Sequence, residues 1–139
     1  MHYRRLGSKW LVRLDRGDEI VTSLKELVKK EGIRLGAVSG IGAVGRATIG
    51  LFESATKQYH SREVTGDMEI ASLTGNISEL NGEAYLHLHI TLTDATNAAF
   101  GGHLSAATIS CTGEIIIDGM EGQADRAFSE EIGLNLLKF

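Results

Sequence analysis

The sequence predicts an α+β fold in which one helix packs against a largely antiparallel sheet of about seven strands. Only in residues 19–31 do apolar residues recur three and four positions apart, which is the spacing typical of an amphipathic helix. Most later segments alternate apolar and polar residues, or are rich in β-branched residues, as strands are. The chain also has 17 glycines and no proline, which favours tight turns and close contacts between strands.

Length and composition restrict the classes of protein that are possible. The 139 residues contain no repeat, linker or low-complexity tract, so residues 1–139 are expected to form a single domain. The net charge of -4 disfavours a general nucleic-acid binder, which needs a basic surface to neutralise phosphates. No apolar run approaches the ~18 residues that span a bilayer, and the N-terminal residues lack the apolar core of a signal peptide.

Cysteine usage indicates the compartment. The chain has one cysteine, Cys111, so it can form no internal disulfide and fits a reducing compartment. We therefore expect a cytoplasmic protein. Because Cys111 lies within a predicted strand, a buried structural thiol is its expected role.

The first part of the chain predicts a strand followed by the helix. Residues 9–14 alternate in the manner of a strand, with Trp10 on the apolar face. Asp18 is a plausible N-cap for the helix over residues 19–31, and Gly32 is its expected end.

The rest of the chain favours strands. They are expected at residues 35–41, 46–52, 59–64, 69–76, 83–92, 104–107, 110–117 and 134–137. A glycine-rich turn is expected between the first two of them, and the last could close the sheet.

That glycine-rich run, residues 40–45, matches the G-x-G-x-x-G pattern of dinucleotide-binding loops. Such a loop has to open a helix whose N-terminus receives the pyrophosphate. Here Thr48, Ile49 and Gly50 follow, and these residues favour a strand. The run is therefore predicted to join two strands, and Arg46 beside it is a minor candidate for binding an anion.

The longest clean strand pattern, at residues 83–92, contains two histidines. Alternation places His87 and His89 on one face of this strand. The residues of the opposite, core-facing side are Leu86, Leu88, Ile90 and Leu92. Two imidazoles at positions i and i+2 can reach a common point, which is the geometry that a metal needs from one strand.

A third histidine completes a candidate metal site. His103 follows Gly101 and Gly102, which would let the backbone turn and approach closely, and a hairpin over residues 93–100 would bring it beside His87 and His89. Three neutral imidazoles suit zinc, with iron, nickel or copper as alternatives, and leave a fourth position open for water or a small molecule. His2 and His60 lie far away in sequence and are expected on the surface.

Other catalytic arrangements are less specific. A triad of Ser39 or Ser105 with a histidine and Asp94 can be drawn, but neither serine lies in a nucleophile-elbow pattern. Carboxylates would be expected to orient metal-bound imidazoles. The candidates are Glu69, Glu83, Asp94 and Glu114. The sequence identifies no acid, base or nucleophile, so whether the protein is an enzyme stays open.

With these residues in view, the chain resembles the plants-and-prokaryotes-conserved (PPC) domain in its stand-alone prokaryotic form. The resemblance covers nearly the whole chain. The matching features are the early helix after Gly17-Asp18, the glycine turn at residues 40–43, the strand end at residues 73–76, His87-Leu88-His89, and the segment of residues 101–104 that contains His103. The two histidine motifs at this spacing are the specific part.

The resemblance implies a mainly antiparallel sheet around one helix, a homotrimer, and a metal site to which His87, His89 and His103 correspond. Plant relatives carry an AT-hook, an Arg-Gly-Arg-Pro segment that enters the DNA minor groove. This chain has no proline and so no such hook, and DNA binding is not expected. The first hypothesis is therefore a trimeric metalloprotein acting on a small polar molecule, and the alternative is a non-enzymatic regulatory or assembly module.

Overall fold

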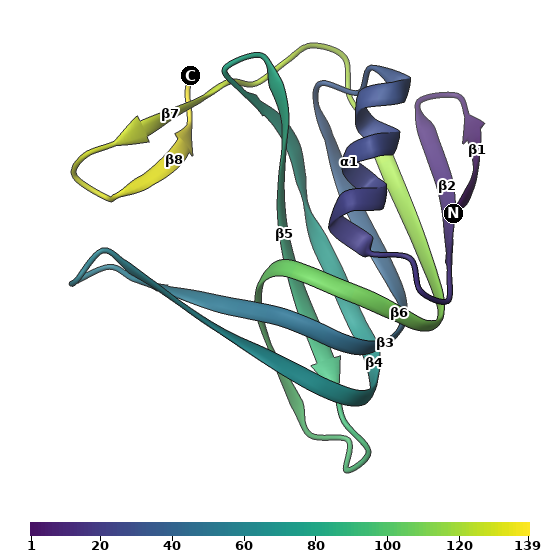
Figure 1. The fold of residues 1–139 in the computed structure, drawn as a ribbon. Coiled ribbons are helices and arrows are strands. Elements are labelled where there is room, and N and C mark those ends of the chain that lie inside the picture. The colour runs from purple at the N-terminus through teal and green to yellow at the C-terminus, as the bar shows by residue number, and fades with distance from the viewer.

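The computed structural model describes residues 1–139 and contains one helix and eight strands (Figure 1). In chain order the elements are β1 (His2–Leu6), β2 (Lys9–Asp15), α1 (Ile20–Glu31), β3 (Gly36–Glu53), β4 (Gln58–Leu80), β5 (Glu83–Thr93), β6 (Ala99–Gly119), β7 (Arg126–Ser129) and β8 (Leu134–Leu137). The helix is neither long nor apolar enough to cross a membrane.

Six strands form one antiparallel sheet in the order β1-β2-β6-β3-β4-β5. The long strand β6 also pairs with β5, so that the sheet bends back on itself (Figure 1). The early part of β6 lies beside β5, and its later part lies between β2 and β3. The prediction of a mainly antiparallel sheet with one helix is confirmed.

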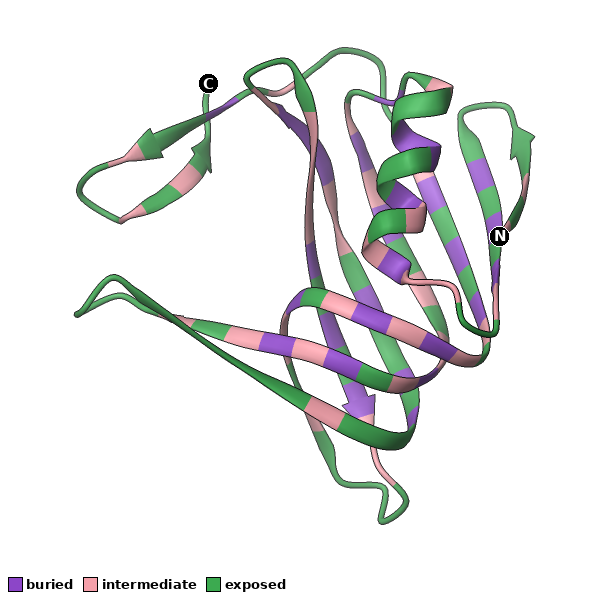
Figure 2. Cartoon of the chain, viewed as in Figure 1, coloured by how far each residue is buried: buried purple, intermediate pink, exposed green.

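The core lies between the helix and the inner face of the sheet. Helix residues Ile20, Leu24, Leu27 and Val28 are buried, because their spacing puts them on one side of α1. Strands show the matching alternation of buried and exposed positions in Figure 2. On β2, for example, Trp10, Val12 and Leu14 are buried while the intervening residues are exposed.

The helix ends are close to those predicted, but the N-cap differs. Glu19, not Asp18, is the N-cap, and its carboxylate accepts hydrogen bonds from the backbone N–H groups of Val21 and Thr22 at 3.0 and 2.7 Å. Asp18 instead accepts a bond from the N–H of Asp15 and so closes the turn before the helix. Gly32 ends the helix in the left-handed region with φ of 67°, as expected.

The glycine-rich run does not form a turn. Residues 35–41 and 46–52 were expected to be separate strands, but both belong to β3, which continues through residues 40–45 with register shifts. A Cβ on Gly42 would lie 2.3 Å from the Thr112 carbonyl oxygen, and the φ of this glycine is 150°. The run therefore serves the close approach of β3 to β6, and no helix follows it that could bind a pyrophosphate.

Two further pairs of predicted strands also merge. Residues 59–64 and 69–76 lie in β4, and residues 104–107 and 110–117 lie in β6. Residues 134–137 do form a strand, but β8 pairs only with β7 in a separate hairpin and does not close the main sheet. Cys111, expected to be buried, is exposed, because it lies on the outer face of β6.

Candidate metal site

The strand β5 presents His87 and His89 on the outer face of the sheet. Alternation along β5 buries Leu88, Ile90 and Leu92 on the core side, which forces the histidines to the other side. In the register with β4, His87 lies opposite Asn76 and His89 lies opposite Thr74. This predicted arrangement of β5 is confirmed.

The neighbouring strand β6 supplies His103, which lies directly opposite His89 in the register of β5 and β6. The hairpin after β5 brings it there, as expected. The two glycines before it lie within β6 instead of forming a turn. Glycine is still required for the close pairing of β5 and β6, since a Cβ on Gly101 would lie 2.1 Å from the Ile90 carbonyl oxygen. A similar close approach holds on the other side of β5, where a Cβ on Gly75 would lie 2.0 Å from the carbonyl oxygen of His87.

The three imidazoles converge. The ring centroids are 5.1 Å apart for His87 and His89, 5.3 Å for His87 and His103, and 5.6 Å for His89 and His103. One nitrogen from each ring lies within 4.8 Å of the others, and the Nε2 atoms of His87 and His89 are 3.3 Å apart. Two ligands at zinc–nitrogen distances in tetrahedral geometry lie roughly 3.3 Å apart, so this donor set fits zinc.

The protonation of the cluster also suits a metal. The pKa of His87 lies below its ordinary value, first because burial penalises the charged imidazolium and then because His103, His89 and Arg126 repel its positive charge. Burial and, to a smaller extent, His89 lower the pKa of His103. Both rings are therefore neutral near pH 7, and neutral imidazole is the form that binds a metal.

An aromatic side chain supports the third ligand. The ring of Tyr59 on β4 meets His103 edge-on, with centroids 5.6 Å apart. It lies over Gly50 of β3, where a Cβ would clash with it at 2.3 Å. Tyr59 is 44% exposed, but partial desolvation of its hydroxyl raises its pKa, so that it stays a neutral phenol.

The expected orienting carboxylates are elsewhere. None of Glu69, Glu83, Asp94 and Glu114 hydrogen-bonds to the three histidines. Asp94 instead accepts bonds from the N–H groups of Thr96 and Ala98 and from the Thr96 hydroxyl, which fixes the β5–β6 hairpin. Ser39 and Ser105 form no hydrogen bond with a histidine either, so the triad finds no support.

The structure adds Arg126 of β7, a residue that the sequence reasoning missed. Arg126 is 9% exposed, and its guanidinium lies 4.6 Å from the ring centroid of Tyr85. Its Nη2 donates to Oδ1 of Asn76, the residue opposite His87, at 3.0 Å. No sequence pattern surrounds Arg126, and only the return of the chain after β6 places it here.

The remaining candidates lie away from the cluster. His2 and His60 are exposed and lie beside Asp15 and Glu53, at 3.3 and 3.4 Å, which agrees with the expectation of surface positions. Arg46 lines a shallow pocket that also contains Glu19 and Glu63, and two carboxylates beside it make an anion site there unfavourable.

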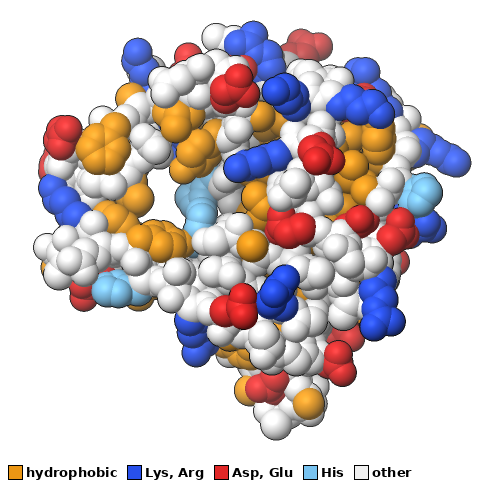
Figure 3. All heavy atoms as spheres, viewed as in Figure 1, with side chains coloured by type: hydrophobic (Ala, Val, Ile, Leu, Met, Phe, Trp, Pro, Cys, Tyr) orange, Lys and Arg blue, Asp and Glu red, His pale blue; other side chains and the backbone are white.

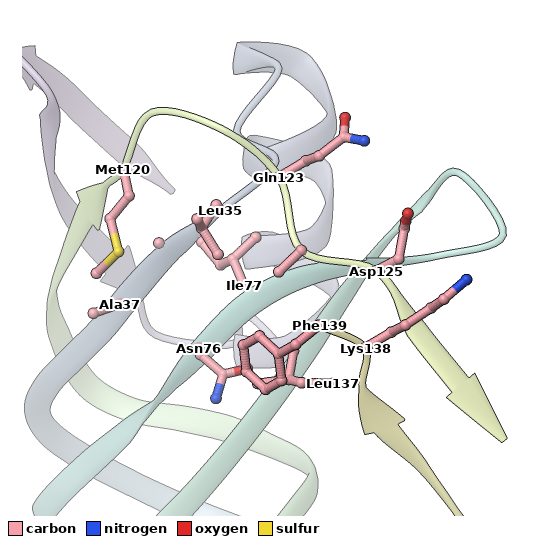
Figure 4. Close-up of a pocket in the computed structure, with 12 residues that line it drawn as sticks. Leu35, Ala37, Asn76, Ile77, Met120, Gln123, Asp125, Leu137, Lys138 and Phe139 are labelled. Carbon is pink, nitrogen blue, oxygen red and sulfur yellow. The ribbon is translucent and has the colours of Figure 1, made fainter. Parts of the chain in front are cut away.

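A larger pocket, of about 580 Å³, begins next to the cluster, because Asn76, the residue opposite His87, also lines it. Figure 4 shows it between the C-terminal residues Leu137 and Phe139 and the start of β3, where Leu35 and Ala37 lie. Its lining is mostly apolar and contains none of the three histidines. The histidine cluster is where metal-ligating side chains gather, so we place the candidate functional site there.

A curved antiparallel sheet with three clustered histidines on its outer face defines a small protein with a candidate site for a transition metal. Residues 1–120 match the model of the Plants and Prokaryotes Conserved (PCC) domain, and the chain belongs to this family. The resemblance found in the sequence is thereby confirmed.

Solved structures share the fold over the whole chain. A protein from Bacteroides thetaiotaomicron with a provisional DNA-binding description is 37% identical, with a TM-score of 0.97 and coverage of 99% of this chain and 96% of that one. The metal-containing protein AF0104 from Archaeoglobus fulgidus is 31% identical, with a TM-score of 0.87 and coverage of 100% and 99%. A plant- and prokaryote-conserved protein from Pyrococcus horikoshii is 30% identical, with a TM-score of 0.87 and coverage of 99% and 95%.

Curated relatives are much longer proteins. The bifunctional protein GlmU of Synechococcus sp. strain JA-2-3B'a(2-13) is 30% identical over 108 residues. That match covers 76% of this chain but only 16% of the relative. The chain therefore spans less than a fifth of the length of the curated relatives it matches.

Proposed function

We propose that this protein binds one divalent transition metal through His87, His89 and His103, with zinc as the first choice. The observation that carries the proposal is the convergence of three imidazole nitrogens within 4.8 Å of one another. Histidines that serve only solubility do not need to meet from two strands. The relative from Archaeoglobus fulgidus, itself described as metal-containing, supports the proposal.

We further propose that the site acts on a small polar molecule. Three protein ligands leave one position of a tetrahedral ion open, and a bound zinc ion supplies Lewis acidity there. The chain's own part is to hold the imidazoles neutral and close together, with Tyr59 against one of them. His89 is exposed, so that a ligand can reach the cluster from solvent.

Elemental analysis of tag-free protein, prepared without chelator, tests the metal site. We expect about one zinc or other transition metal ion per chain. The result that would reject the site is a metal content near zero both as purified and after incubation with zinc, nickel and cobalt followed by desalting.

The proposal also includes assembly of the chain with copies of itself, and exposed apolar side chains favour it. On the outer face of the sheet Leu11, Ile41 and Ile116 are 51%, 58% and 45% exposed, and Leu11 lies opposite Ile116 in the β2–β6 register. We propose that copies of the chain meet through this face as a homotrimer. Light scattering should give about three times the 15.0 kDa mass of the chain, and I116K should shift it toward one.

DNA binding, suggested by the description of the Bacteroides relative, is not part of our proposal. The chain has 18 acidic and 14 basic residues, and a duplex needs a basic surface. Fluorescence anisotropy with a 20-base-pair duplex at low salt should show no binding. Affinity that falls steeply with added salt would require this view to be abandoned.

A further inference from the structure

One buried charge near the histidine cluster has no counter-charge. Arg126 is 9% exposed, and it takes part in none of the ion pairs of the chain. The contrast with Arg34 is direct, because Arg34 forms a two-point ion pair with Glu79 and its side chain is 54% exposed. Burying an unpaired guanidinium costs folding free energy, so its presence at this position needs an explanation.

The partners of Arg126 are all neutral. Its Nε donates to Oγ of Ser78 at 2.8 Å, Nη1 to the carbonyl oxygen of Asn135 at 2.9 Å, and Nη2 to Oδ1 of Asn76 at 3.0 Å. The ring of Tyr85 lies against its face. These contacts fix the orientation of the guanidinium and engage three of its five N–H groups, and they leave its positive charge uncompensated.

The register places this charge beside the candidate metal site. Ser78 lies opposite Tyr85, and the next pair on the same face is Asn76 and His87. Two residues along a strand correspond to roughly 7 Å, so a molecule of a few heavy atoms can span the distance between the two groups. Figure 3 shows histidine at the edge of an opening in the surface, on the side from which the β7–β8 hairpin projects in Figure 1.

We propose that Arg126 is the anion-binding group of a subsite beside the histidine cluster, and that the ligand of this protein is a small carboxylate with a second oxygen that faces the metal position. This inference rests on the proposed metal site. A planar guanidinium with two N–H groups to spare matches a carboxylate in charge and shape. The ligand then neutralises the buried charge, which neutral molecules of the same size cannot do.

Titration with glycolate and with glycolamide, its neutral analogue, tests the proposal. The readout is the Nε–Hε NMR resonance of Arg126 in the zinc-loaded protein. Glycolate should shift this resonance with half-saturation at least ten-fold lower than that of glycolamide. An unmoved resonance, or equal affinity for the two probes, overturns the proposal.

Variants separate recognition from a purely structural clamp. For the variants, isothermal titration calorimetry gives the two affinities, because R126Q lacks the Arg126 resonance. R126Q should bring the two affinities within two-fold of each other, whereas K25Q, which removes a charge from the helix surface, should keep the preference. S78A removes one partner of the clamp but keeps the guanidinium, so the preference should survive even if the melting temperature falls. Loss of the preference in S78A with the Arg126 resonance unmoved by glycolate would assign Arg126 to the clamp alone.

The two proposals fail in different ways. If the protein holds no zinc, the metal site is rejected, and the same titration of the metal-free protein then decides the subsite. A glycolate-dependent shift at Arg126 would retain the anion subsite without the metal, and the lack of any shift would reject both.

Discussion

The five histidines of this chain fall into two groups with opposite surroundings. His2 and His60 are exposed, and each lies beside a carboxylate. His87, His89 and His103 lie beside one another, with no carboxylate hydrogen-bonded to them, and two of them have lowered pKa values. An isolated histidine gains from a negative neighbour, whereas a cluster of neutral imidazoles is stable without one only if the rings stay unprotonated or share a cation. The neighbours of each histidine thus indicate its role better than its exposure does.

The largest expected effect separates the two groups by metal content. H87A and H103A should each lower the bound metal from about one ion per chain to below roughly a tenth, because two imidazoles hold zinc far more weakly than three. H2A and H60A should retain the full amount. Elemental analysis after desalting measures all four variants, and equal loss in H60A would contradict the assignment of ligands.

The next effect concerns the backbone behind the cluster. G75A should destabilise the fold by roughly 2–4 kcal/mol, because its Cβ would lie 2.0 Å from the carbonyl oxygen of His87 and push β4 from β5. G45A is the matched control, since its Cβ would make only an ordinary contact at 3.6 Å with Ser110. Urea denaturation of the metal-free variants provides the measurement, and equal stability of the two would show that β4 and β5 yield easily.

Acid should destabilise the folded chain through the histidine cluster. In the folded chain His87 and His103 have pKa values below the ordinary 6.5, so the unfolded chain binds protons first. Their contribution to stability is therefore complete above pH 6.5 and is lost as the pH falls from there through the folded values. Melting temperatures of the metal-free protein between pH 8 and pH 5 should show this loss, and H87Q should reduce it. An H87Q profile that superimposes on that of the wild type would show that another group is responsible.

The smallest effect is expected at a lone histidine. H60Q should change the free energy of unfolding by less than about 0.5 kcal/mol, because the contact with Glu53 is exposed and screened by water. The change should also leave metal content unaltered. A loss of stability above about 1 kcal/mol would mean that the β3–β4 hairpin needs the contact between His60 and Glu53 to stay folded.

The histidine site could be predicted from sequence because its signal is local. In β5 leucine and isoleucine alternate with the histidines, so that one strand pattern fixes both the core face and the ligand face. The hairpin length then sets the position of His103. Local pattern and final structure agree wherever one strand and its hairpin contain all the necessary information.

Several predicted strand boundaries were wrong because a glycine within a strand resembles a glycine in a turn. The glycines in β3 and β6 predicted turns between separate strands, but Gly42 instead allows these two strands to approach each other closely. Whether a glycine forms a turn or allows a close approach of two strands depends on the strand opposite it. The sequence around Gly42 does not contain that strand. Strand β1 was not predicted because its residues show little alternation. The role of Arg126 was not predicted because its position depends on where the chain returns after β6.

The pairing of β6 has a consequence for synthesis on the ribosome. β6 joins β2 near the start of the chain to β3 in the middle, and it also holds His103 beside β5. The sheet therefore cannot close until residue 119 has left the exit tunnel, and until then β2 has only β1 as a partner. Nascent chains expose unpaired strand edges for nearly the whole of translation, a period in which chaperones protect such edges from aggregation.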